Sequence, residues 1–222
     1  MIFNLETIEE DLKGFQADFE RINSELAMRR EDITDDMVAH IVEAYRFLND
    51  LLRKKMDLFT PAGLHALLEM NHIVLCGTNP ETRSQYYQHL TETRNSFLKK
   101  ITPIKEWVLK KRQGGNPHKI ATGFYTRALS QPQLFLEGNH RTGNILLNYL
   151  LVSANALPFI VTRDSAKNYL DMSGEIKFTN KDNSFDATMK MPGHNKRFRQ
   201  FLQDTGSDRY LMNAGKSVRS YG

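Results

Sequence analysis

Apolar residues recur at helical spacing over most of the chain. Between residues 35 and 54 they fall on one face, at Met37, Ile41, Tyr45, Leu48 and Leu52. Thr-Pro or Asn-Pro pairs at 60–61, 79–80, 102–103 and 116–117 each set a good N-cap residue before a proline, a pattern typical of helix starts. The sequence therefore predicts a mostly α-helical bundle with short connections, in which Gly77 ends the helix that begins at residue 61.

One predicted helix differs from the others. From Ile145 to Val152 the chain is apolar almost all round, interrupted only by Asn148. A helix without a polar face belongs at the centre of a bundle. The run F-L-E-G-N-H-R-T-G-N at 135–144 comes directly before it, so the sequence predicts a polar loop that opens onto the N-terminus of a buried helix.

Two segments near the C-terminus have different patterns. Over 176–191 apolar residues alternate with polar ones on both sides of Asn180-Lys181-Asp182-Asn183, which predicts a small peripheral β-hairpin. This hairpin is either a docking edge for a partner or a purely peripheral feature. The stretch from Thr205 is rich in Gly, Ser, Asn and Arg, and it predicts a loose tail over 205–222.

The composition argues against a nucleic-acid-binding protein and against a membrane-spanning one. The chain has 222 residues, of which 40% are hydrophobic and 25% charged, as in ordinary globular proteins. Its net charge of +4 is spread over short basic runs, so no nucleic-acid partner is expected. No stretch approaches the roughly 20 apolar residues needed to span a bilayer, so no membrane partner is expected either.

The single cysteine, Cys76, excludes a disulfide within the chain and favours a reducing compartment. Together with an N-terminus that lacks a basic and apolar leader, this predicts a cytoplasmic protein, with an effector secreted by a specialised system as the alternative. Cys76 itself is either a nucleophile or a small buried hydrophobe, and its place after Ile73-Val74-Leu75 favours the buried hydrophobe.

The loop at 135–144 carries the candidate chemistry. A helix N-terminus leaves backbone N–H groups unpaired and carries partial positive charge, so it attracts anions. Gly138 and Asn139 suit the positive φ angles of a nest of converging N–H groups, and the guanidinium of Arg141 matches a phosphate. Glu137 offers a carboxylate to a magnesium ion. These residues predict a phosphate site.

The same loop resembles the Fic (fido) family signature, H-x-F-x-[D/E]-G-N-G-R-x-x-R. The matching residues are Phe135, Glu137, Gly138, Asn139 and Arg141. The resemblance covers roughly residues 35–175 and implies a Fic-type helical bundle around a central buried helix. It divides the chain into an N-terminal helical extension (1–34), the Fic-like core (35–175), the hairpin with a C-terminal helix (176–204) and the tail.

Fic proteins usually transfer AMP from ATP to a Ser, Thr or Tyr hydroxyl of a target protein, and they often form homodimers. Carried over by position, the resemblance makes Glu137 the magnesium ligand and assigns the nucleotide or phosphate to the residues that follow. These are Gly138, Asn139, His140, Arg141, Thr142, Gly143 and Asn144. Asn139 has a second interpretation, which is plain capping of the loop.

Three departures from the signature affect activity. Gln133 replaces the catalytic His, and a neutral amide cannot act as a general base, which costs typically ~10²–10⁴ in rate. His140 replaces the second Gly; contact with phosphate or exposure to solvent is preferred over service as a substitute base. Asn144 replaces the second Arg and removes a cation from the site.

These observations favour a divergent Fic-family protein that binds a nucleotide or another phosphate-containing ligand at 133–144, with AMP transfer lost, weak or altered. The alternative is an active transferase, which would move AMP or a related phosphate group onto a protein hydroxyl with a non-standard base. A third hypothesis, a helical bundle without an anion site, leaves the signature unexplained. The first two hypotheses differ in whether the site can transfer AMP with Gln133 in place of the catalytic His, so the sequence leaves enzymatic activity open.

Overall fold

The structure, a computed structural model, describes residues 1–212 and is built from helices. In chain order they are α1 (Leu5–Ala17), α2 (Phe19–Ser24), α3 (Asp35–Arg53), α4 (Pro61–Cys76), α5 (Pro80–Gln85), α6 (Tyr87–Arg112), α7 (Pro117–Leu129), α8 (Asn139–Ser153), α9 (Ala166–Lys177), the π-helical turn η1 (Asp186–Lys190), α10 (Met191–Thr205) and the 3₁₀ turn η2 (Asp208–Tyr210). Within this range β structure is limited to two isolated bridges, and no helix is both long and apolar enough to cross a membrane.

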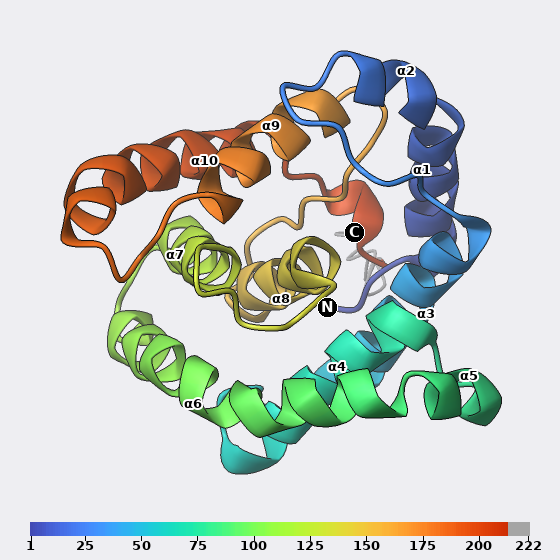
Figure 1. Cartoon of the computed structure of the whole chain (residues 1–222), viewed down its shortest axis with the longest axis horizontal. Helices are drawn as coiled ribbons and strands as arrows, with labels where there is room; N and C mark the ends of the chain where they lie inside the picture. The colour runs from blue at the N-terminus through green and yellow to red at the C-terminus, as the bar shows by residue number, and fades with distance from the viewer. Residues whose placement is uncertain (213–222) are drawn as a thin grey trace, which may run out of the picture.

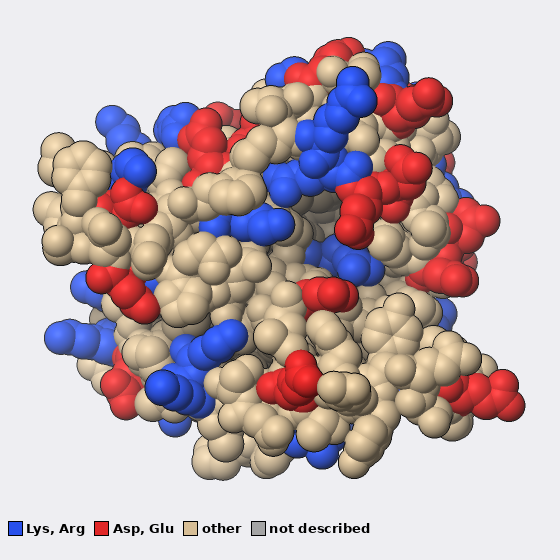
Figure 2. Space-filling view, viewed as in Figure 1, with Lys and Arg blue, Asp and Glu red and all other residues tan. Residues whose placement is uncertain are grey.

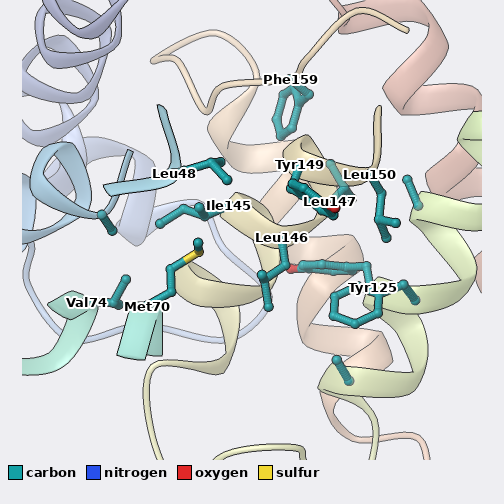
Figure 3. Packing of buried hydrophobic residues seen from close by; sticks show 14 of the residues in the cluster. Leu48, Met70, Val74, Tyr125, Ile145, Leu146, Leu147, Tyr149, Leu150 and Phe159 are labelled. Carbon is teal, nitrogen blue, oxygen red and sulfur yellow. The ribbon is translucent and has the colours of Figure 1, made fainter. Parts of the chain in front are cut away.

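Helix α8 lies in the middle of the bundle, with the other helices arranged around it (Figure 1). Every residue from Thr142 to Val152 is buried, as the all-round apolar pattern predicts. Figure 3 shows side chains of α3, α4 and α7, such as Leu48, Met70 and Tyr125, packed against the apolar residues of α8. The predicted bundle with a central buried helix is confirmed.

Most of the predicted helix boundaries are also confirmed. The hydroxyl oxygen of Thr60 accepts a hydrogen bond from the Gly63 N–H at 3.1 Å, and the side-chain oxygen of Asn116 accepts from the Lys119 N–H at 3.0 Å. Gly77 ends α4 at a positive φ of 63°, where a residue with a side chain would be strained. These ends depend on local chemistry, which is why the sequence predicts them.

The prediction that a helix starts at Pro103 was wrong, because α6 runs through this proline without a break. Ile101 and Ile104 on either side of it are both buried in the core, so packing outweighs the lost backbone hydrogen bond. Thr102 does not cap a new helix either, because its hydroxyl donates back to the carbonyl of Leu98 at 2.7 Å.

The predicted β-hairpin at 176–191 was also wrong. Helix α9 extends to Lys177, and the segment continues through a turn into η1 and α10. The polar residues of the supposed hairpin turn act as helix caps, because the Asn183 side-chain oxygen accepts from the N–H groups of Phe185 and Asp186 at 2.9 and 3.2 Å. The apolar residues Phe185 and Met189 lie four apart, a spacing that also fits one helical face.

Several residues of the segment 1–34, which the resemblance sets apart as an N-terminal extension, pack into the main core. Phe3 is fully buried, and the side chain of Asn49 in α3 bonds to its backbone N–H and C=O at 2.7 and 3.0 Å. Residues 205–212, predicted as the start of a loose tail, are packed as well, since Tyr210 is buried and Leu211 bridges to Phe3. The rest of the predicted tail, 213–222, lies outside the described residues.

Candidate functional site

The loop before α8 is fixed by hydrogen bonds from its own and neighbouring side chains. The Asn139 side chain accepts from the Phe135 N–H and donates to the Phe135 C=O, both at 2.9 Å. From α4, the Asn71 amide donates to the Glu137 carbonyl at 3.1 Å and to the Thr142 hydroxyl at 3.0 Å. Gly138 turns the chain into α8 at a φ of 71°, in the left-handed region predicted for this position.

These contacts separate two roles within the loop. Phe135 is buried and stacks on Phe97 of α6 with ring centroids 5.7 Å apart, so it anchors the loop to the core. Asn139 uses both ends of its amide on the backbone of Phe135, which favours the capping interpretation of this residue. The loop therefore holds the N-terminus of α8 in a fixed position.

The N-terminus of α8 offers backbone donors. The first intrahelical bond runs from the Thr142 N–H to the Gly138 carbonyl at 2.9 Å. The preceding N–H groups of the first turn, at residues 139–141, have no carbonyl one turn back to pair with. Together with the helix dipole, they give this end of α8 partial positive charge.

A cavity of about 540 Å³ opens at this end of α8. Its wall is formed by the loop, the start of α8, α1 with the segment 29–33, α3, Ile160 and Val161, and α9. The predicted site residues that line it are Gln133, Glu137, Gly138, Asn139, His140, Arg141 and Asn144. Thr142 and Gly143 do not line the cavity, because Thr142 is fully buried under Asn71 and Gly143 packs against Tyr125.

His140 lies in the wall with both ring nitrogens buried and, among the described residues, without a hydrogen-bond partner. Burial lowers its pKa to about 3, helped by the positive charges of Arg30, Lys177 and Arg141. The imidazole is therefore neutral at physiological pH. The expectation that it could point to solvent was wrong, because both ring nitrogens are buried.

Asn144 lies one turn further along α8, and only 8% of its surface is exposed. Its side-chain oxygen accepts from the Tyr45 hydroxyl and from Asn148, both at 3.3 Å. Its side-chain nitrogen is buried and has no partner in the described part of the chain. This residue thus lines the cavity and keeps a buried donor without a partner among the described residues.

Arg141 and Glu137 contribute opposite charges. One guanidinium nitrogen of Arg141 donates to the Val74 carbonyl at 3.2 Å, which ties the side chain to α4, and burial lowers its pKa. An arginine stays protonated near neutral pH even so. Glu137 is exposed on the cavity rim.

Gln133 is half-buried in the wall, and its amide nitrogen donates to the Leu129 carbonyl at 3.1 Å. The backbone just before it is held by the Lys181 ammonium, which donates to the carbonyls of Ser130, at 2.9 Å, and Pro132. Gln133 therefore has its amide oxygen to offer to a ligand.

Sequence reasoning missed part of the site. Arg29, Arg30 and Glu31, between α2 and α3, and Lys177 at the end of α9 add charge to the wall. An apolar side comes from residues such as Phe15, Phe19, Met37, Ile160 and Val161. The most distant of the residues named here, Phe15, lies 120 positions before Phe135. The adjacent Arg29-Arg30 pair is a local feature of the sequence that could have pointed to this side of the site.

The lining carries four cationic side chains, Arg29, Arg30, Arg141 and Lys177, against the two carboxylates of Glu31 and Glu137. Figure 2 shows Lys and Arg side chains gathered around a hollow on the face in view. Within residues 1–212, no group of three or more His, Cys, Asp or Glu side chains is arranged to hold a metal ion. The charge balance favours an anionic ligand.

Comparisons of the chain with protein-family models, with curated proteins and with solved structures found no match in any of the three.

Proposed function

We propose that this chain is a divergent Fic-type protein whose cavity at the N-terminus of α8 binds a nucleotide or another phosphate-containing ligand. The observation that carries the proposal is a cluster of buried polar atoms without partners in one cavity wall: both ring nitrogens of His140, the side-chain nitrogen of Asn144 and Nε of Arg30. A buried polar group left unpaired costs roughly 1–3 kcal/mol. Four of the ten such atoms among the described residues belong to this lining, which supports a ligand that pairs them once these side chains turn towards it.

The charge of the site supports a phosphate in particular. The first amides of α8, the guanidinium of Arg141 and an excess of cationic side chains surround the same cavity. The apolar side of the wall, with Phe15 and Phe19, suits the less polar part of a ligand such as a nucleoside. A ligand with both parts fits this lining better than a free inorganic ion.

A magnesium ion fits this site only if it binds together with the phosphate groups of the ligand. Mg²⁺ is commonly held by one or two carboxylates together with substrate phosphates. Glu137 supplies one exposed carboxylate at the rim, which is consistent with this arrangement. Bound there, the ion would neutralise phosphate charge beside Arg141.

The proposal includes AMP transfer that is lost or weak. Gln133 cannot take a proton from an attacking hydroxyl, and His140, with a pKa of about 3, is a poor base at neutral pH. The alternative, an active transferase that modifies a target protein with a non-standard base, has one specific observation in its favour. His140 lines the cavity, its buried ring nitrogens have no partner among the described residues, and a bound anion would raise the pKa of this imidazole.

Binding can be tested by calorimetry and thermal shift with ATP, ADP, AMP and CDP-choline, each with and without Mg²⁺. We expect at least one of these ligands to bind the wild type, and the Arg141→Gln variant to bind it about tenfold more weakly. A wild type that binds none of them would contradict the proposal.

Transfer can be tested separately with labelled ATP, Mg²⁺ and a cell lysate that supplies target proteins. We expect Gln133→His to label more protein than the wild type, because it restores a general base. Label from the wild type that disappears in His140→Gln would support the alternative. If neither the wild type nor Gln133→His transfers label while both still bind the ligand, the protein is a binding module without AMP transfer.

A further inference from the structure

The segment between α2 and α3 places Arg30 against α9. Its backbone is clamped by Asn23, whose side chain accepts from the Arg30 N–H at 2.7 Å and donates to the Arg30 carbonyl at 3.0 Å. The Arg30 guanidinium donates to the Leu170 carbonyl at 3.0 Å. Arg30 is thus held in one place by groups on α2 and α9.

Gly174 of α9 provides the space for this side chain. A Cβ atom at residue 174 would lie 2.8 Å from a terminal nitrogen of Arg30 and 2.6 Å from the end of Met28. Only a residue without a side chain allows the guanidinium to pack this close to the helix.

The Arg30 side chain also faces the ligand cavity. Its Nε atom is buried and without a partner among the described residues, and Arg30 lines the same cavity as Asn144 and Arg141. Its positive charge contributes to the low pKa of His140. A partly buried guanidinium whose buried Nε has no partner among the described residues is stabilised by an anion placed between it and the imidazole of His140.

Residue 144 is the position at which the signature has its second arginine. We propose that Arg30 supplies the missing cation from the N-terminal segment, and that it binds the same phosphorylated group as Arg141, which selects ligands carrying at least two negative charges. This inference rests on the proposed function. It makes residues 25–34 part of the binding site.

The test is calorimetry of the full chain with ADP and with inorganic pyrophosphate. The variants are Arg30→Gln, Arg30→Lys and the matched control Arg21→Gln, which removes the same charge from an exposed arginine of α2. We expect Arg30→Gln to weaken both ligands about tenfold and Arg30→Lys to lose less. Arg21→Gln should bind as the wild type does.

The outcomes separate the two proposals. If the wild type binds none of ATP, ADP, AMP and CDP-choline, the proposed function fails and this inference fails with it; if it binds one of these but neither ADP nor pyrophosphate, only this inference fails. If the wild type binds but Arg30→Gln matches Arg21→Gln, only the role of Arg30 is wrong. Adenosine, which carries no phosphate, is measured as a further ligand. If Arg30 has a purely structural role, Arg30→Gln would weaken the binding of adenosine as much as the binding of ADP, and that result would also overturn the inference.

A second variant keeps the test decisive if Arg30→Gln does not fold. Gly174→Ala retains every charge, but its Cβ atom must displace both the Arg30 guanidinium and the end of Met28. We expect this variant also to lose affinity for ADP, while an unchanged affinity would contradict the inference.

Discussion

Asn139 and Phe135 are joined by two hydrogen bonds, so one side chain pairs both backbone groups of a buried residue four positions earlier. This pairing closes the loop that the resemblance assigns to phosphate binding. It follows that the amide of Asn139 sets the shape of the loop.

The first prediction concerns this pair. Asn139→Ala leaves the N–H and C=O of Phe135 unpaired in the core, so it should lower the free energy of unfolding by about 2–4 kcal/mol. Denaturant unfolding would measure the loss. The control Asn95→Ala, at an exposed position of α6, should change it by less than about 0.5 kcal/mol. Equal effects of the two substitutions would refute the structural role of Asn139.

The second prediction uses two glycines with similar backbone conformations. Gly138 and Gly114 have φ angles of 71° and 77°, so an alanine at either costs about 1 kcal/mol of backbone strain. A Cβ at residue 138 would also lie 3.1 Å from the Asn71 amide nitrogen, whereas a Cβ at 114 meets nothing within 4 Å. Gly138→Ala should therefore be the more destabilising variant in thermal unfolding and should weaken ligand binding, whereas Gly114→Ala should bind normally.

The third prediction concerns pH and His140. The pKa of this imidazole is about 3 in the folded chain and near its ordinary value of 6.5 when unfolded. The unfolded chain therefore binds more protons between these values, so stability is full above pH 6.5 and falls as the pH drops towards 3. His140→Gln should flatten this part of the stability curve, measured by unfolding at pH 4 and 7. The exposed His65→Gln should keep the wild-type slope.

A fourth prediction follows from the same imidazole in the bound state. An anion beside His140 favours its protonated form, so binding of a phosphorylated ligand should be accompanied by uptake of a proton. Calorimetry in buffers with different enthalpies of ionisation measures this uptake directly. A binding enthalpy that does not depend on the buffer at pH 5.5 would contradict it.

The fifth prediction concerns Lys181, which holds the backbone before Gln133. Burial lowers the pKa of Lys181 to about 8, so its ammonium is still mostly protonated at pH 7. Lys181→Met removes the donor to Ser130 and Pro132 and should cost about 1–3 kcal/mol of stability. The exposed Lys99→Met is the control, and chemical denaturation of both variants provides the comparison.

The sequence was sufficient for features that depend on neighbouring residues. The caps at Thr60 and Asn116, the glycine at the end of α4 and the apolar character of α8 are written in short stretches of chain, and each is confirmed. The loop residues were predicted for the same reason, since a helix N-terminus can be located from local chemistry.

The wrong prediction of a hairpin and the site residues that were not predicted have a different origin. Over so few residues as 176–191, an alternating pattern and a helical one overlap, and the capping by Asn183 decided for helix. Arg30 and Lys177 join the site only through tertiary packing, which no local pattern encodes. The expected homodimer, target protein and cytoplasmic location stay predictions.

The pairing of Phe3 with Leu211 has a mechanical consequence. The two segments run antiparallel, with the Met212 N–H bonded to the Ile2 carbonyl and the Asn4 N–H bonded to the Tyr210 carbonyl. A force that separates residues 1 and 212 would load these bonds one after the other, from the outer pair inwards, as in a zipper. The two paired segments should therefore separate at low force, before the helices behind them are pulled apart.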